Sequence, residues 1–381
     1  MNSLKNDFLL DPDVAFLNHG SFGACPAPVF EAYQAWQREL EKQPVEFLGR
    51  RAGTLLAESR QKLAEYLHTS RDNLVYVTNA THGLNIIARS LQLEPGAEIL
   101  ASDHEYGALD RTWRFLTQKK GTVYINRPIL VPLTSHQDFV EQFWSGVTPH
   151  TRIIFLSHIT SPTALVFPIK AICDRARSAG ILTVIDGAHA PGQIPLDLED
   201  LGCDFYSGNL HKWLCAPKGA AFLYARPEVQ SFLEPLIVSW GWESEQPGPS
   251  TFVDHHEWLG TRDISAFLSV PAAIDYQASH HWDAVRSASH KLVLSTGIQI
   301  EDLTHMPGLT YEPDLWYTQM GTSFLPDSTD ISALKTRIYD IDRIEVPLIR
   351  WNGKNLIRYS YQAYNTSEDQ DRLIQALKKY L

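Results

Sequence analysis

The chain has 381 residues, a net charge of -11 at pH 7, 44% hydrophobic residues and 20% charged ones. That composition is typical of a globular protein with an ample core, and the acidic balance argues against nucleic acid or an anionic membrane as a partner. No apolar run approaches the roughly 18 residues that span a membrane, and residues 1–10 contain no segment typical of a signal peptide. The four cysteines form no CxxC pair and no metal-ligand spacing, so we expect free thiols, no metal and a cytoplasmic location.

The N-terminal region predicts an arm followed by helices. Residues 1–30 should form an irregular arm, with Phe16-Leu17 extended and Asn18-His19-Gly20-Ser21-Phe22-Gly23 in a turn. For His19, a buried histidine with satisfied hydrogen bonds is as good an explanation as a functional one. A helical region follows over about 28–68, and Pro44 should interrupt it because proline breaks a helix interior.

Strands then alternate with helices. We predict helices at 80–91 and 169–179, and strands at 74–77, 98–101, 122–125, 152–156, 181–185, 203–206 and 219–224. This alternation predicts an α/β fold whose large domain holds a doubly wound, mostly parallel sheet. Neither GxGxxG nor GxxxxGK[ST] occurs, so nucleotide binding has no supporting motif.

Small and hydroxyl residues follow the first of these strands, in Thr78-Asn79-Ala80-Thr81-His82-Gly83. Where a strand leads into a helix, free N–H groups, a hydroxyl and the positive end of the helix dipole favour a phosphate. By itself the signal is weak, because Asn and Thr are also common N-caps.

A carboxylate ends the most apolar strand. Ile181 to Ile185 predicts a strand buried on both faces, and Asp186 follows it at the edge where open α/β sheets bind ligands. A buried carboxylate there needs a cationic partner or a shifted pKa. The competing explanation for Asp186 is a helix cap or a turn residue.

Lys212 lies in Tyr206-Ser207-Gly208-Asn209-Leu210-His211-Lys212-Trp213, next to a histidine and a tryptophan. Taken alone it would be interpreted as a surface lysine, although such neighbours favour a desolvated amine with a lowered pKa. Together with Asp186, Lys212 suggests a cofactor site. A lysine that forms a Schiff base and an aspartate for the pyridinium nitrogen are the two protein groups that pyridoxal 5′-phosphate requires.

The residue pattern of the remaining chain predicts a loop, helices and a small domain. Residues 236–260 are rich in Trp, Gly, Pro and Ser, and we expect a long loop whose Trp240, Trp242 and Trp258 belong to a dimer interface or substrate pocket. A helical stretch over 264–300 precedes a C-terminal α+β domain. It should have strands near 320–325, 343–348 and 355–360 and helices near 330–340 and 367–381. The expected divisions are an N-terminal arm over 1–30, a large domain over 31–305 and a small domain over 306–381.

Arg358 falls inside the last of these strands, in Leu356-Ile357-Arg358-Tyr359-Ser360. A guanidinium group there can bind a carboxylate through two hydrogen bonds. A structural salt bridge is the usual explanation for such an arginine, so the residue pattern alone leaves its role open.

The spacing from Asp186-Gly-Ala-His to Ser-Gly-Asn-Leu-His-Lys212-Trp resembles the class V aminotransferase family. The likeness runs from Phe16-Leu17-Asn18-His19-Gly20 to Tyr364-Asn365-Thr366 and is greatest with the isopenicillin N epimerase-like branch. Cysteine desulfurases and hercynylcysteine sulfoxide lyases share the same core. The resemblance implies the aspartate aminotransferase-like fold of pyridoxal-phosphate-dependent transferases and a homodimer with shared active sites.

The resemblance also implies roles for individual residues. Lys212 would hold the cofactor and act as the base at Cα, and Asp186 would keep the pyridine nitrogen protonated. Tyr106 would stack on the ring, while His189 and Ser161, which stands where relatives have an asparagine, would lie near the phenolic oxygen. The phosphate-binding positions would be Ala80 through its backbone, Thr81, Asn209, His211 and Thr261 of the neighbouring subunit. On the substrate side the implied residues are Arg358, for the carboxylate of an amino-acid-like substrate, and Asn18 and His19 of the arm.

Three outcomes of Cα deprotonation share these residues: epimerisation, C–S cleavage as in cysteine-conjugate or hercynylcysteine sulfoxide lyases, and transamination. Branch resemblance places epimerisation slightly ahead. A hypothesis of another class is a non-catalytic scaffold that binds the cofactor, but a carrier would not need the electron sink that Asp186 provides. Sulfur transfer of the desulfurase kind is not expected, since no cysteine lies between Met320 and Arg358.

Overall fold

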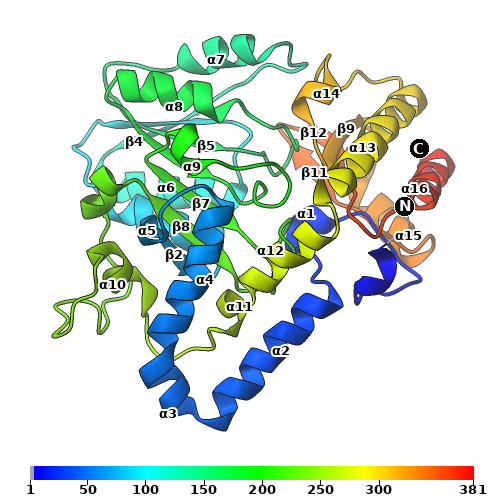
Figure 1. The fold of residues 1–381 in the computed structure, drawn as a ribbon. Helices are drawn as coiled ribbons and strands as arrows, with labels where there is room; N and C mark the ends of the chain where they lie inside the picture. Colours follow the sequence, from blue (N-terminus) through cyan, green and yellow to red (C-terminus); the bar gives the residue numbers. More distant parts are fainter. Residues whose placement is uncertain (1–3) are drawn as a thin grey trace.

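A seven-stranded sheet forms the centre of the protein in the computed structural model, which describes residues 4–381 (Figure 1). Its strand order is β2-β8-β7-β6-β5-β3-β4. The strands are β2 (Leu74–Val77), β3 (Glu98–Ser102), β4 (Val123–Arg127), β5 (Thr151–Ser157), β6 (Leu182–Asp186), β7 (Phe205–Asn209) and β8 (Ala221–Ala225). Strands β3 to β7 pair in parallel, and β8 is antiparallel to both of its neighbours, β2 and β7. The predicted α/β fold with a mostly parallel sheet is therefore confirmed.

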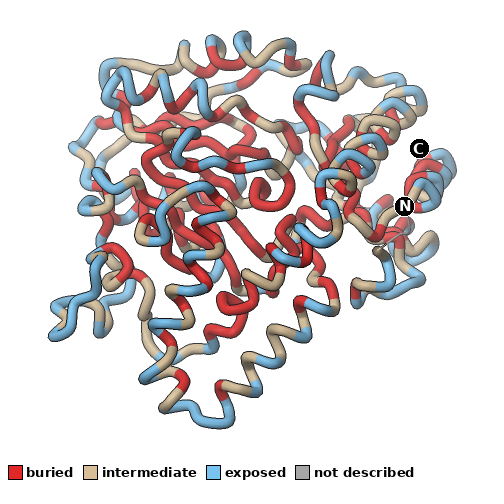
Figure 2. The backbone as a smooth tube through the Cα atoms, viewed as in Figure 1, coloured by how far each residue is buried: buried red, intermediate tan, exposed pale blue. Residues whose placement is uncertain are grey.

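Both faces of this sheet are buried. Val184 of β6 packs into one apolar cluster and the next residue, Ile185, into another, as expected when successive side chains point to opposite faces. The same alternation holds for Tyr76 and Val77 of β2. Figure 2 shows the result, a buried sheet beneath helices with exposed outer surfaces. Two-sided burial explains why the strands are continuous apolar runs rather than alternating ones.

Helices surround the sheet and extend beyond it (Figure 1). They are α2 (Ala27–Lys42), α3 (Pro44–Glu46), α4 (Ala52–Tyr66), α5 (Ala80–Ser90), α6 (Gly107–Lys120), α7 (His136–Trp144), α8 (Ile169–Ser178), α9 (Leu198–Leu201), α10 (Thr251–Glu257), α11 (Ser265–Leu268), α12 (Val270–Ser279) and α13 (Trp282–Thr304). A π-helical turn at Phe47–Arg51 and short 3₁₀ turns at Leu4–Asp7, Arg71–Asn73 and Pro227–Phe232 complete the set. The predicted interruption at Pro44 is confirmed, because α2 ends at Lys42 and the chain bends before α3.

The predicted loop over 236–260 is wrong in part, because it contains α10. The Ser250 side chain accepts a hydrogen bond from the Val253 amide and so caps this helix. Trp240 is 85% exposed and Trp242 45% exposed, whereas Trp258 is half-buried.

A smaller antiparallel sheet of order β11-β12-β9 lies beside α13 (Figure 1). Its strands are β9 (Met320–Leu325), β11 (Leu348–Trp351) and β12 (Lys354–Ser360), and the helices near it are α14 (Pro313–Trp316), α15 (Ile331–Asp340) and α16 (Ser367–Tyr380). The single strand predicted near 343–348 is instead two, β10 (Ile344–Glu345) and β11, which are separated by Val346-Pro347. Proline has no N–H to give to a strand partner.

The N-terminal arm joins this smaller sheet region. Strand β1 (Ala15–Phe16) pairs in parallel with β10, and the predicted turn after it is a helical turn, α1 (His19–Phe22). Helix α13 ends at Thr304, next to the expected boundary at residue 305, but the proposed domain limits stay a prediction. Within residues 4–381 no helix is long and apolar enough to cross a membrane.

Candidate active site

A pocket of about 570 Å³ opens at the carboxyl ends of β5, β6 and β7 and at the start of α5. The parallel register brings Ser157, Asp186 and Ser207 side by side at this edge. Most of the predicted site residues line the pocket together: Ala80, Thr81, Tyr106, Ser161, Asp186, His189, Asn209, His211 and Lys212. The open end of a parallel sheet therefore collects residues that are far apart in the sequence.

Asp186 and Lys212 face the same pocket from adjacent elements. Asp186 is only 3% exposed, and its Oδ1 accepts a hydrogen bond from the Ala188 amide at 2.9 Å. Burial raises the pKa of the Asp186 carboxyl, while that amide and the positive charge of Lys212 oppose the rise. Burial likewise lowers the pKa of the Lys212 amine, helped by the nearby guanidinium of Arg358 and opposed by Asp186.

His189 and Trp213 adjoin the lysine. His189 Nε2 lies 3.2 Å from Lys212 Nζ, and the Trp213 indole N–H donates to His189 Nδ1, also at 3.2 Å. Both aromatic side chains are buried. Burial first, and then the charges of Lys212 and Arg358, hold the pKa of His189 well below its usual value, so the imidazole is neutral.

The start of α5 presents donors to the pocket. Among residues 4–381, the Thr81 amide and hydroxyl have no protein partner. The Ala80 amide instead donates to Asn209 Oδ1 at 2.8 Å, so the structure does not leave this predicted backbone donor free. His211 Nδ1 donates to the Ala220 carbonyl at 3.2 Å, and burial, with the charge of Lys212, lowers the pKa of His211 to about 4.

Arg358 lies on β12 directly behind two residues of the pocket wall. Its Nη1 donates to the Ser161 carbonyl at 2.5 Å and Oγ at 3.2 Å, and its Nη2 donates to Ser21 Oγ at 3.1 Å. All three acceptors are neutral, and the described part of the chain offers Arg358 no carboxylate. The salt bridge that would explain this arginine structurally is therefore not found within residues 4–381. Arg358 itself does not line the pocket and is a buried charge without a carboxylate partner just behind the wall.

Four predicted site residues do not line the pocket: Arg358, Asn18, His19 and Thr261. Asn18 Nδ2 donates to Glu345 Oε1 at 2.8 Å. His19 is fully buried, with Nε2 donating to the Lys212 carbonyl and Nδ1 accepting from the Tyr364 hydroxyl, each at 2.9 Å. It therefore supports the lysine loop from beneath, as expected of a buried, satisfied histidine. Thr261 is exposed, and its predicted contact needs a second subunit.

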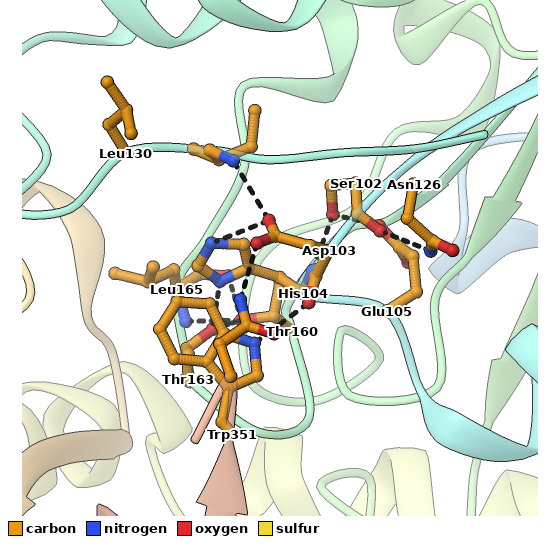
Figure 3. Close-up of polar contacts among 12 residues, drawn as sticks. Ser102, Asp103, His104, Glu105, Asn126, Leu130, Thr160, Thr163, Leu165 and Trp351 are labelled. Atoms are coloured by element: carbon orange, nitrogen blue, oxygen red, sulfur yellow. Dashed lines mark hydrogen bonds and ion pairs between the residues drawn. The ribbon is translucent and has the colours of Figure 1, made fainter. Parts of the chain in front are cut away.

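From the sequence, no role was assigned to Glu105, which lies shortly after β3 (Figure 3). Glu105 is buried; its Oε1 accepts from Ser102 Oγ at 2.5 Å and its Oε2 from the Ser157 amide and hydroxyl at 2.8 and 2.6 Å. Burial raises the pKa of Glu105 to about 8. This carboxyl fixes the segment that places Tyr106 at the pocket. The polar run from Ser102 to Glu105, directly after an apolar strand, is the signal that could have found it.

Comparisons with known proteins agree with this geometry. A model of the aminotransferase class-V family matches residues 23–317. The chain belongs to this family. It is therefore an enzyme that depends on pyridoxal 5′-phosphate.

Individual relatives refine the placement within the family. The chain is 37% identical to an isopenicillin N epimerase of Amycolatopsis lactamdurans, over 97% of this chain and 96% of that protein. A second isopenicillin N epimerase, from Streptomyces clavuligerus, is 35% identical over 98% and 96%. A probable chloroplastic L-cysteine desulfhydrase of Arabidopsis thaliana is 27% identical over 96% and 83%.

Among solved structures, a mutant of C-DES with glycine covalently linked to its cofactor is similar, with a TM-score of 0.85, 21% identity and 97% coverage of both chains. The cysteine desulfurase CsdA of Escherichia coli has a TM-score of 0.82 at 20% identity, covering 99% of this chain and 97% of the other. At these identities the likeness shows the fold alone.

The residues of the pocket fit the cofactor. An amine and a buried carboxylate face one cavity, and the unpaired donors of Thr81 lie at a helix N-terminus, where an anionic phosphate is favoured. Within residues 4–381 no cluster of three or more His, Cys, Asp or Glu side chains could hold a metal ion.

Proposed function

We propose that the chain acts at Cα of an amino-acid-like substrate, with epimerisation of an isopenicillin N epimerase-like kind as the favoured reaction. The observation that carries this proposal is that Lys212 and Asp186 line one pocket, while an arginine without a carboxylate partner is hydrogen-bonded to two residues of its wall. A non-catalytic scaffold that only carries the cofactor would need neither the arginine nor the carboxylate.

Each residue has a distinct task in this proposal. Lys212 would hold the cofactor through its side-chain amine, and the free amine would accept the Cα proton of the substrate. Asp186 keeps the pyridine nitrogen protonated, and Thr81, Asn209 and His211 hold the phosphate. Bound pyridoxal phosphate supplies an electron-accepting ring that makes the Cα–H bond of an attached amino acid acidic.

Arg358 orients the substrate by binding its carboxylate through two hydrogen bonds. Ser161 and Ser21, which hold the guanidinium group by their oxygens, keep it aimed at the pocket. Tyr106 is 45% exposed at the pocket wall, where its ring is free to stack on the cofactor.

C–S cleavage is the first alternative, supported by the desulfhydrase relatives, and transamination is the second. Sulfur transfer through a protein thiol is not part of the proposal. No cysteine lines the pocket, and burial raises the pKa of Cys25, the least buried of the four, to about 12. The thiolate such a transfer needs is therefore disfavoured.

The proposal also includes a homodimeric assembly and a cytoplasmic location. The exposed Trp240 and Trp242 and the exposed Thr261 support a homodimer in which each subunit completes the other's site. Four free cysteines support a reducing, cytoplasmic compartment.

The first prediction is that Lys212 carries the cofactor. Borohydride reduction of the purified enzyme followed by peptide mapping should label Lys212, because only its amine lies beside Asp186 in the pocket. Lys212→Ala should abolish the label. Lys218→Arg, a change six residues further on and outside the pocket wall, should leave it in place, and label on another lysine of the wild type would contradict the proposal.

The reaction itself can be read from the fate of Cα. A panel of L- and D-amino acids and cysteine S-conjugates in deuterium oxide separates the three outcomes. Deuterium at Cα with inversion indicates epimerisation, release of pyruvate indicates C–S cleavage, and a keto acid that retains its side chain indicates transamination. We expect the first outcome. No Cα exchange with any compound, despite bound cofactor, would favour the scaffold.

A further inference from the structure

His189 is held between two nitrogen atoms, one at each of its ring nitrogens. Trp213 Nε1 lies 3.2 Å from Nδ1, and Lys212 Nζ lies 3.2 Å from Nε2. His189 is 2% exposed and Trp213 is fully buried, so water does not compete for the indole contact. These two neighbours therefore decide which ring nitrogen of the neutral imidazole carries the proton.

The indole contact has only one possible direction. An indole N–H donates and cannot accept, so His189 Nδ1 must offer a lone pair. A neutral imidazole with a lone pair on Nδ1 carries its proton on Nε2. The doubly protonated ring is excluded by the same contact, because it would set two N–H groups against each other. The Nε2–H bond then points at Lys212.

The lysine amine completes a directed chain of hydrogen bonds. An ammonium group has no lone pair, so it could not accept the Nε2–H of His189, whereas a free amine accepts it. Of the other charged and titratable groups facing this pair, Asp186 on β6 favours the ammonium form, and Arg358 on β12 opposes it. His19 and His211, which lie close to His189, have lowered pKa values through burial and are neutral.

We propose that Trp213 is a positioning residue whose indole N–H fixes His189 as the Nε2–H tautomer, and that this tautomer keeps the Lys212 amine in its unprotonated, nucleophilic form. The inference rests on the proposed role of Lys212, since only an unprotonated amine can attack the cofactor aldehyde. Once the lysine is engaged, the same N–H remains a donor for an oxygen in the pocket.

Both rings are fixed in place by their surroundings. The Trp213 carbonyl accepts from Gln277 Nε2 at 2.8 Å, and the His19 ring packs on the indole with centroids 4.9 Å apart. The His189 carbonyl accepts from Gln193 Nε2 at 2.7 Å. The backbone of Gly20 lies beside the pair: a Cβ there would be in ordinary contact with both rings, 3.5 Å from His189 Cε1 and 3.6 Å from Trp213 Cζ2. Contacts from α1, α12 and Gln193 therefore hold the two residues in place.

The wild-type apoenzyme tests the tautomer directly. With histidine labelled by ¹⁵N, ring nitrogens that carry a proton are distinguished from those with a lone pair, and His189→Gln identifies the His189 signals among the 15 histidines. We expect a proton on Nε2 and none on Nδ1. A proton on Nδ1 would overturn the inference without any change at Trp213.

Trp213→Phe tests the consequence for the lysine. The pH dependence of Lys212 labelling in the apoenzyme, read by competitive acylation and mass spectrometry, gives its titration midpoint. Removing the indole donor should raise that midpoint by about one unit, a roughly tenfold loss of free amine at a given lower pH. Trp316→Phe is the matched control: Trp316 is also fully buried and donates its indole N–H to the Thr134 carbonyl, far from the lysine. It should leave the midpoint unchanged.

A double variant separates the hydrogen bond from loss of packing. In His189→Gln the side-chain amide always has an N–H to donate, so adding Trp213→Phe should not move the Lys212 midpoint further. An equal shift in both backgrounds would overturn the inference. These measurements use the apoenzyme, so cofactor label at a different lysine would refute the proposed function and leave the tautomer result standing. Normal label at Lys212 with an unmoved midpoint in Trp213→Phe would refute only the inference.

Discussion

The residue directly after Asp186 has no space for a side chain. A Cβ on Gly187 would lie 1.9 Å from Cε1 of Tyr206, whose hydroxyl also forms a 3.0 Å hydrogen bond with His158 Nδ1. The tyrosine is fully buried and cannot move aside freely. The glycine therefore keeps the carboxylate of Asp186 at its place in the pocket.

Gly187→Ala should lower the free energy of unfolding by about 1–3 kcal/mol or more, because it overpacks the core, and should weaken cofactor binding. Gly53→Ala in α4, where nothing lies within 4 Å of an added Cβ, is the control and should raise stability by about 0.5–1 kcal/mol. Urea denaturation and cofactor titration measure both effects. Equal stability of Gly187→Ala and the wild type would contradict this prediction, because it would show that the Tyr206 ring moves to make room for the added Cβ.

At the residue scale, the sequence indicated which side chains would line the pocket but not which contacts they would make with one another. That Lys212 and Asp186 would lie in one pocket was predictable, because each lies at or just after the end of a strand and both strands end at the same edge of the sheet. The contact between Trp213 and His189 was not, since it depends on two loops that meet only when β6 and β7 pair. Arg358 was ambiguous for a similar reason: whether a carboxylate lies beside an arginine is a property of the folded chain.

The connection between β3 and α6 is tied to β5 by one carboxyl group. Glu105 accepts three hydrogen bonds, two of them from Ser157 at the end of β5. Trp351 Nε1 adds a bond to the Asp103 carbonyl at 2.9 Å, and His104 Nδ1 lies 2.7 Å from Thr163 Oγ1 (Figure 3). The loop that carries Tyr106 is thereby held by the large sheet, by the 160–165 segment and by the tip of the β11–β12 hairpin.

Glu105 should make stability depend on pH. Its pKa of about 8 in the folded chain lies above the ordinary value of 4.5, so the folded chain keeps a proton that the unfolded chain releases. Its contribution is fully present below the unfolded pKa and is lost as pH rises through the folded one. Each pKa unit corresponds to about 1.4 kcal/mol, so the loss is on the order of a few kcal/mol.

Urea denaturation of the apoenzyme from about pH 5 to about pH 8 tests this sign. The unfolding free energy of the wild type should fall more steeply with pH than that of Glu105→Gln, which cannot titrate. If the unfolding free energies of the two proteins changed equally with pH, the raised pKa of the Glu105 carboxyl would be contradicted.

Elements were predicted best where their pattern was regular. Every strand of the large sheet was found within a few residues, and for the central strands the reason is that two-sided burial requires a continuous apolar run. Helix α10 was missed, since the Trp, Gly and Pro content of its surroundings hides one capping serine. The β11–β12 hairpin carried a usable signal in Asn352-Gly353, both of which have positive φ, as a tight two-residue turn requires.

At the scale of the whole molecule, one surface segment is unusually apolar. Leu236, Ile237 and Val238 are 42%, 46% and 66% exposed, and Trp240 and Trp242 follow them. This segment extends from the body beside α10, away from the smaller sheet (Figure 1). Monomeric proteins rarely expose such a run, and burial against a second copy would remove it from water.

We therefore expect light scattering to give twice the chain mass of 43.0 kDa. Replacing Ile237 and Val238 with Asp should convert the dimer to a monomer, because two charges cannot be buried unpaired in an interface. Tyr311→Asp, at a residue that is 70% exposed on the other side of the fold, is the control and should leave the dimer intact. If Thr261 of each subunit completes the partner's site, the monomer must also bind the cofactor more weakly. A monomer that retains full cofactor affinity would show that each chain forms its site alone.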